Sequence, residues 1–258
     1  SQLEATYLVT PAFGDYLRAF KAFDVKLVTC PLSDFGFSIL DLGLPIQNPK
    51  SKIQNRIGLL LNNPHNPTGQ LFSRETIKPL LDRFALVVVD EAFMDFLPPH
   101  QEQSLIPLVQ DYPNLVILRS LTKFYSLPGL RLGYAIAHPE RLGRWQQWRD
   151  PWPVNVLAAA AAVAVLEDTA FQQQTWDWLA STGPQLFEGL AALPGLKPFR
   201  GAANFLLVQS EPSSLWVQET LLKHHQILIR DCLSFPELGD RYFRVAVRTE
   251  AENQRLLK

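Results

Sequence analysis

RSLTKFYSLPGLRLGY, residues 119–134, places two hydroxyls, a lysine and an arginine around the bend that should follow a strand. Ser120 and Thr122 can donate hydrogen bonds to a phosphate, and the planar guanidinium of Arg131 can bind the same group. Lys123 would then lie beside the bound anion with its amine free. A basic, hydroxyl-rich surface loop is the alternative interpretation. The pattern favours a phosphate-binding loop that carries a reactive lysine.

Two other polar segments each follow a short apolar run. Asn66 lies in the segment NPHNPTG, Asp90 begins the segment DEAF, and a third apolar run, 115–118, leads to Lys123. Short apolar runs that end in turn residues are typical of buried parallel strands. Ligands of open α/β sheets bind at the carboxyl ends of such strands. We therefore predict that Asn66, Asp90 and Lys123 converge on one crevice.

These residue types suit pyridoxal phosphate. A lysine held at the cofactor phosphate can form a Schiff base with the cofactor aldehyde, as Lys123 could do here. An aspartate beside the pyridine nitrogen keeps that nitrogen protonated and makes the ring an electron sink, which fits Asp90. The amide of Asn66 can bond the phenolic oxygen. Each segment alone is a common turn or cap, but their order along the chain predicts a cofactor site.

The chain resembles the fold-type I pyridoxal-phosphate enzymes of the class I/II aminotransferase family, on the strength of the three segments quoted above. The resemblance implies that Lys123 carries the Schiff base and that Asp90 pairs with the pyridine nitrogen, which makes both residues catalytic. The cofactor-binding residues that it implies are Lys123, Asn66, Asp90, Ser120, Thr122 and Arg131.

The substrate-binding residues come from the same resemblance. Arg244, in the segment YFRVAVR, matches the C-terminal arginine that binds the substrate carboxylate in this family. A surface strand arginine is the alternative, and Arg248 takes the role if the register differs by four residues. Phe93 departs from the family, because many members have a tyrosine there that bonds the phenolic oxygen. Asn66 is then the main polar neighbour of that oxygen.

Within the family, four segments are similar to the threonine-phosphate decarboxylases of cobalamin biosynthesis: residues 120–134, 151–155, 227–232 and 241–248. This similarity implies a cytoplasmic homodimer that decarboxylates L-threonine O-3-phosphate, a phosphorylated amino acid, to (R)-1-aminopropan-2-ol phosphate. Histidinol-phosphate aminotransferases share most of the framework, so transamination is the alternative. The orientation of the substrate carboxylate decides between the two reactions, and motifs do not determine it. A non-catalytic fragment that keeps the fold is a third possibility.

The beginning of the chain is part of the resemblance. TYLVTPAF, residues 6–13, is similar to the second strand of the family's large domain and its proline-aromatic loop. The resemblance therefore implies a preceding strand, helix and N-terminal arm that residues 1–258 do not contain. In the family, the amides at the start of that helix bind the cofactor phosphate. The expectation is that residues 1–258 alone bind pyridoxal phosphate weakly and aggregate through an exposed sheet edge.

The alternation of strand and helix up to about residue 137 predicts an α/β fold with a mostly parallel sheet and flanking helices. The large, cofactor-binding domain is predicted over 1–165, and a small C-terminal α+β domain over 166–258. Strands of the small domain are expected at 204–208, 227–230 and 242–247. Helices are expected at 73–84 with Ser73 as N-cap, at 139–148, at 154–166 as a buried helix, and at 171–193.

Composition narrows the choice of partners. The chain has 258 residues, 47% of them hydrophobic, and a net charge of −1, so nothing indicates a nucleic-acid or membrane surface. Cys30 and Cys232 lack metal-ligand spacing and are expected to be free, buried thiols in a reducing compartment. The five histidines form no ligand cluster. We expect no metal, and a small molecule as the substrate.

Overall fold

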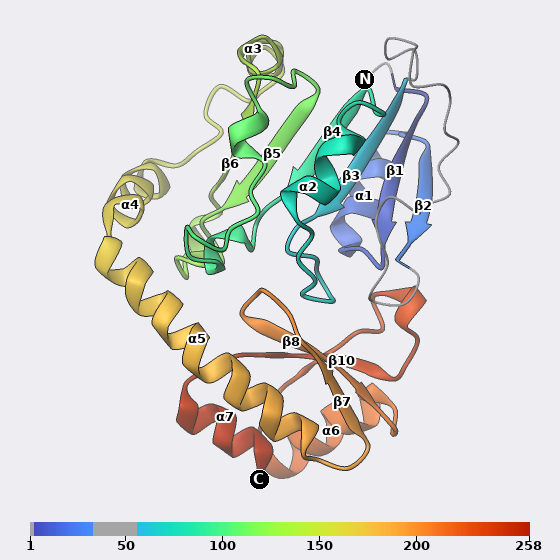
Figure 1. Ribbon diagram of the computed structural model, residues 1–258, viewed down its shortest axis with the longest axis vertical. Coiled ribbons are helices and arrows are strands. Elements are labelled where there is room, and N and C mark those ends of the chain that lie inside the picture. Colours follow the sequence, from blue (N-terminus) through green and yellow to red (C-terminus); the bar gives the residue numbers. More distant parts are fainter. Residues whose placement is uncertain (1–2, 33–55) are drawn as a thin grey trace.

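The computed structural model describes residues 3–32 and 56–258. Within them, six strands form one sheet and four form a second (Figure 1). The first sheet has the order β2-β1-β3-β4-β5-β6. Its strands are β1 Ala5–Thr10, β2 Leu27–Pro31, β3 Ile57–Asn62, β4 Leu86–Asp90, β5 Leu115–Ser120 and β6 Gly133–Ala137.

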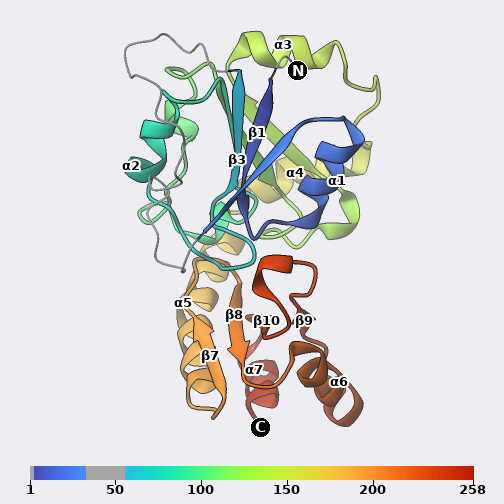
Figure 2. The same cartoon turned by 90° about the vertical axis from the view of Figure 1, so that its right-hand side faces the viewer.

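This first sheet is mostly parallel. β1 to β5 pair in parallel, and β6 runs antiparallel to β5 along the edge. Two helices, α1 (Gly14–Ala22) and α2 (Arg74–Ile77), lie on opposite sides of the sheet (Figure 2). The predicted class, a fold-type I α/β architecture, is confirmed.

Apolar strand residues make up the core of this part. Val87, Val89, Leu59 and Leu61 are at most 1% exposed. Burying each such side chain stabilises the fold by roughly 1.5–3 kcal/mol. Because both faces of the sheet are covered, the central strands β3 and β4 are apolar runs that each end in a polar residue.

The second sheet is antiparallel, with the order β7-β8-β10-β9. Its strands are β7 Leu196–Phe199, β8 Phe205–Ser210, β9 Arg230–Asp231 and β10 Tyr242–Ala246. The remaining helices are α3 Pro139–Gln146, α4 Val156–Glu167, α5 Thr169–Ala191, α6 Ser214–His225 and α7 Glu250–Leu257. α5 extends from the first sheet along the second (Figure 1), and Leu186 and Leu190 on it pack against β8 and β10.

The two sheets meet through a backbone contact between two glycines. The amide of Ala202 donates to the carbonyl of Gly69 over 2.8 Å. A Cβ atom on Gly201 would lie 2.9 Å from the Cα atom of Gly69, which itself has a φ of +75°. Side chains at either position would therefore push the two segments apart or strain the turn.

The helix expected at 73–84 is shorter than predicted. Ser73 is its N-cap, as expected, and its hydroxyl accepts from the amide of Thr76 over 3.1 Å. α2 ends at Ile77, however, and a 3-10 turn over Lys78–Leu80 follows. Pro79 accounts for the difference, because it has no amide hydrogen to donate to the carbonyl four residues earlier, as an α-helix requires.

The prediction of a buried helix at 154–166 is wrong in one respect. The helix forms, as α4, but Ala158 is its only buried residue in the described chain. Val156, Leu157 and Val163 are 78%, 71% and 60% exposed. An apolar sequence predicts that a helix is covered, but it does not say by which chain. Exposed apolar patches of this kind are typical of interaction surfaces.

The strand expected at 227–230 is reduced to Arg230–Asp231. The preceding residues complete the end of α6 instead: Gln226 is left-handed, and the amide of Ile227 donates to the carbonyl of Leu221. This is the usual pairing at a helix C-terminus. Cys30 and Cys232 are free and buried, as expected. No helix in residues 3–32 and 56–258 is long and apolar enough to cross a membrane.

Candidate functional site

Asp90 lies at the carboxyl end of β4, and Tyr16 of α1 holds its carboxylate. The Tyr16 hydroxyl donates to Oδ2 over 2.5 Å, and the amide of Ala92 donates to Oδ1 over 2.9 Å. Burial raises the pKa of Asp90, while these two bonds and the nearby Lys123 charge lower it. Burial and the Asp90 charge raise the pKa of Tyr16, so the phenol remains a donor. The carboxylate is thus oriented from two sides.

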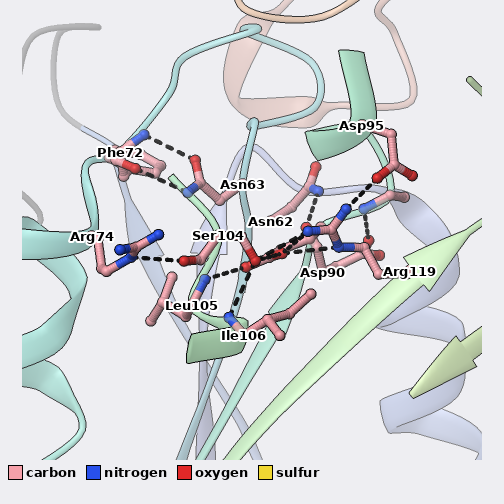
Figure 3. Close-up of polar contacts among 12 residues, drawn as sticks. Asn62, Asn63, Phe72, Arg74, Asp90, Asp95, Ser104, Leu105, Ile106 and Arg119 are labelled. Carbon is pink, nitrogen blue, oxygen red and sulfur yellow. Dashed lines mark hydrogen bonds and ion pairs between the residues drawn. The ribbon is translucent and has the colours of Figure 1, made fainter. Parts of the chain in front are cut away.

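A chain of hydrogen bonds connects Asp90 with Arg244 of the second sheet. Asn62 donates to the Asp90 carbonyl over 2.7 Å (Figure 3), and its Oδ1 accepts from the amide of Asn66 over 2.7 Å. The Oδ1 atom of Asn66 in turn accepts from Nη1 of Arg244. Because Arg244 takes the amide oxygen, the NH2 group of Asn66 remains as a donor.

Lys123 and Arg244 line the same cavity, whose volume is about 490 Å³. Arg230 lines it as well, directly opposite Arg244 in the antiparallel pairing of β9 and β10. The Arg244 guanidinium carbon lies 4.4 Å from the centre of the Phe205 ring. Burial lowers the pKa of Arg244, and the charge of Arg230 lowers it further. The cavity therefore concentrates positive charge.

The two candidate carboxylate-binding arginines differ in their partners. In the part of the chain that the structure describes, no acidic side chain forms an ion pair with Arg244. Arg248 is 63% exposed and pairs with Glu252 over 2.7 Å. Both line the cavity. Arg244 is half-buried and has no acidic partner among the described residues, so it is the better placed of the two to bind an anion.

Of the three predicted phosphate-binding residues, Ser120 and Thr122 lie close together and Arg131 does not contact them. The hydroxyls of Ser120, the last residue of β5, and Thr122 lie 2.7 Å apart. Arg131 is exposed in a left-handed conformation, with a φ of 52°, and donates to the carbonyl of Pro128 over 2.8 Å. No contact between Arg131 and the hydroxyl pair is present among the described residues. The loop would have to reorient this side chain to place it on the same anion.

Sequence reasoning missed two residues of this site. Tyr16 is 74 positions from Asp90 and lies on a helix that carried no site prediction. The aromatic pair Phe13 and Tyr16 after the first strand was the available signal. Arg230 was quoted only as part of a similar segment. Its register opposite Arg244 depends on the pairing of two strands that are far apart in sequence.

His65, in the loop after β3, gives a pH-dependent prediction. Burial lowers its pKa to about 4, against the opposing effect of the Pro11 carbonyl, and its Nδ1 lies 2.8 Å from the Thr68 hydroxyl. Between pH 6.5 and 4 the unfolded chain binds the extra proton, so stability present above pH 6.5 is lost on acidification. We expect His65 to cost about 2 kcal/mol of the free energy of unfolding between pH 7.5 and 5.

Urea unfolding of the parent and of His65→Gln at both pH values measures this loss. The variant should lose about 2 kcal/mol less on acidification than the parent, because glutamine does not titrate. Carboxyl groups titrate in both chains and cancel in the comparison. Equal losses in the two proteins would show that His65 is not the titrating group.

The comparisons with known proteins agree with the fold. Residues 3–258 match the family described as aminotransferase class I and II. The chain belongs to this family, whose members are enzymes that use pyridoxal 5'-phosphate.

The chain is 39% identical over 256 residues to the threonine-phosphate decarboxylase of Salmonella typhimurium, an alignment that covers 97% of this chain and 68% of that protein. It is 31% identical over 250 residues to histidinol-phosphate aminotransferase 1 of Idiomarina loihiensis, covering 96% of this chain and 65% of that protein. The solved histidinol-phosphate aminotransferase from Clostridium acetobutylicum superposes with a TM-score of 0.88 at 27% identity, covering 98% and 76%.

The residues at the strand ends suit this cofactor chemically. Asp90 is a half-buried carboxylate whose two oxygens accept hydrogen bonds from Tyr16 and from the Ala92 amide. Asn66 keeps an amide donor, Ser120 and Thr122 present a close pair of hydroxyls, and the amine of Lys123 reaches the cavity. A phosphorylated pyridine aldehyde offers a ring nitrogen for a carboxylate, an aldehyde for an amine, and oxygens for amide and hydroxyl donors. The residues at the strand ends provide each of these groups.

Proposed function

We propose that this protein decarboxylates L-threonine O-3-phosphate to (R)-1-aminopropan-2-ol phosphate, a step of cobalamin biosynthesis in the cytoplasm. The observation that carries the proposal is the pair Arg230 and Arg244, directly opposite each other on two strands and facing one cavity. Like charges in this position destabilise a sheet. A substrate with both a carboxylate and a phosphate would neutralise the pair. The identity with the Salmonella typhimurium decarboxylase supports the same reading.

The residues of the site divide the work of such a reaction. When bound, pyridoxal 5'-phosphate supplies an electron sink next to the substrate α-carbon. Asp90 would keep a proton on the pyridine nitrogen, and Ser120 with Thr122 would donate to the cofactor phosphate. The amide NH2 of Asn66 would donate to the phenolic oxygen. Lys123 would supply the amine that holds the cofactor and would afterwards carry a proton.

The two arginines set the outcome of the reaction. Arg244 binds the substrate carboxylate and Arg230 the substrate phosphate, so the substrate is held at both ends. The direction in which Arg244 holds the carboxylate would decide whether carbon dioxide leaves or whether the α-proton is removed instead, which gives transamination. The likeness to histidinol-phosphate aminotransferases keeps that reaction as the second candidate.

Two assays on the purified full-length protein with added pyridoxal 5'-phosphate separate these functions. We expect O-phosphothreonine to release carbon dioxide and to yield aminopropanol phosphate. Histidinol phosphate with 2-oxoglutarate should yield no glutamate. Glutamate formation without release of carbon dioxide would establish the aminotransferase in place of the decarboxylase. Lys123→Ala is the control for a background reaction of the free cofactor.

Substitution of the carboxylate-binding arginine tests the substrate assignment. Arg244→Lys should raise KM for O-phosphothreonine by roughly 10- to 100-fold, because an ammonium cannot form two parallel bonds to a carboxylate, each worth about 1.5–3 kcal/mol. Arg248→Lys is the matched control, since a lysine there can keep the ion pair with Glu252. A larger effect at Arg248 would mean that the register of the assignment is wrong by four residues.

We also propose that the protein is a homodimer. The exposed apolar residues of α4, with Trp152 before it at 87% exposure, form a surface that a second copy would cover. We expect sedimentation to show a dimer, and Leu157→Lys on α4 to shift it toward the monomer, since Leu157 is 71% exposed in one chain. A parent protein that sediments as an active monomer would refute the proposal.

A further inference from the structure

A buried ion-pair network lies directly behind the ends of β4 and β5 (Figure 3). Its members, called here the Arg119 network, are Glu91, Asp95, Ser104 and Arg119. Glu91 follows Asp90 in the sequence, and Arg119 precedes Ser120. The side chains of Arg119 and Glu91 are 5% and 0% exposed. No member lines the cavity that holds Lys123 and Arg244, so the network does not touch the substrate.

All three guanidinium nitrogens of Arg119 have hydrogen-bond or ion-pair partners in the network. Nε and Nη2 of Arg119 each lie 3.0 Å from Oε2 of Glu91. Nη2 also donates to the Ser104 hydroxyl over 3.0 Å, and Nη1 donates to Asp95. The Ser104 hydroxyl donates to Glu91 over 2.7 Å, and the amide of Leu105 donates to the other Glu91 oxygen over 2.9 Å. The planar fork therefore sets the direction of every partner.

Stability alone does not explain such a network. Removing charges from water is costly, and replacing a buried ion pair by apolar residues of similar size is often neutral or stabilising. A purely apolar contact between β4 and β5 would hold the sheet together as well. What a guanidinium adds is direction, because its bonds have set lengths and angles.

The directed bonds act on neighbours of the site. The turn after Glu91 carries the amide of Ala92, which donates to Oδ1 of Asp90 over 2.9 Å. Glu91 and Arg119 thus connect the backbone that carries Asp90 with the backbone that carries Ser120. The indole of Trp176, on α5, donates to the Asp95 carbonyl over 2.8 Å, which ties the same loop to the helix of the second sheet.

We propose that Arg119 is a positioning residue that sets the separation between the Asp90 carboxylate and the Ser120–Thr122 hydroxyl pair. Those groups bind opposite ends of one pyridoxal 5'-phosphate molecule, an assignment taken from the proposed function. When the separation matches the length of the cofactor, binding at one end raises the effective concentration of the other end at its own site. When the separation does not match, the pyridine end and the phosphate end of the cofactor each bind with their own affinity, and binding of one no longer favours binding of the other.

The test compares the whole cofactor with its two halves. Dissociation constants are measured for pyridoxal 5'-phosphate, for pyridoxal and for inorganic phosphate, in the parent, in Glu91→Leu/Arg119→Met and in Arg119→Lys. We expect the apolar pair to lose at least about tenfold in affinity for the whole cofactor and less than about twofold for either half. Arg119→Lys keeps the charge without the fork and should lose an intermediate amount.

Thermal unfolding of the cofactor-free proteins accompanies these measurements. The apolar pair leaves Asp95, 19% exposed, without its cation, so it should unfold at a lower temperature than the parent. The affinities are therefore measured well below that temperature. If it does not fold, Arg119→Lys carries the same comparison. Equal affinity of parent and variants for the whole cofactor would overturn the proposal, as would equal losses for the whole and for each half. A parent that binds the cofactor with this coupling but releases no carbon dioxide would overturn only the proposed function.

Discussion

Lys123→Ala is expected to abolish turnover and to remove the covalent adduct that borohydride traps between the protein and pyridoxal phosphate. Lys123 follows the hydroxyl pair at the end of β5 and lines the cavity that also holds Arg244. An amine in this position can bond the cofactor and can afterwards transfer a proton, and a proton transfer alone contributes roughly 10²–10⁴-fold to a rate. Losing both functions should place activity below detection.

Peptide mapping of the reduced adduct is the measurement. Lys223→Ala is the matched control, because this exposed lysine on α6 pairs with Glu219 over 2.7 Å and does not line the cavity. The control should retain both activity and adduct. An adduct that maps to a lysine other than Lys123 would refute the assignment.

Asp90→Asn should have the second largest effect. The carboxylate is held by Tyr16 and by the Ala92 amide in a buried place, where it can stabilise a protonated pyridine nitrogen. An asparagine keeps the size of the side chain but has no charge to offer that proton. We expect a loss of about 3–4 kcal/mol of transition-state stabilisation, or roughly 10²–10³-fold in kcat.

Steady-state kinetics with saturating cofactor measures this effect. Asp111→Asn, at an exposed position before β5, is the control and should keep the parent rate. A parent-like rate in Asp90→Asn would assign the role to another acid. Tyr16→Phe adds a second check, because it removes only one bond to the same carboxylate and should cost less than Asp90→Asn.

The strand ends were predictable from sequence because two simple patterns coincide there. β3, β4 and β5 each begin with an apolar run, and each strand ends in a polar residue, at Asn62, Asp90 and Ser120. The carboxyl ends of parallel strands lie on one edge of a sheet, so the proximity of the following loops was expected. The roles of their side chains stay predictions until the substitutions are made.

Other features depend on partners that no local pattern specifies. The bond between Tyr16 and Asp90 joins residues 74 positions apart, and the register of Arg230 with Arg244 follows from strand pairing. The exposure of α4 was not predicted, because an apolar sequence indicates that a helix is buried but does not specify whether its own chain or another chain buries it. The early end of α2, by contrast, could have been predicted from Pro79, because the effect of a proline on a helix is local.

The glycine contact between the two sheets has a consequence for how this scaffold can change its specificity. Gly69 and Gly201 touch through backbone atoms, so the gap between the half of the site with Asp90 and Lys123 and the half with Arg230 and Arg244 is fixed by peptide dimensions. Substitutions at the two arginines can then alter the charge of the cavity while its width stays the same. The half with Asp90 and Lys123 can keep one cofactor chemistry, while the half with Arg230 and Arg244 is changed to bind a different acid.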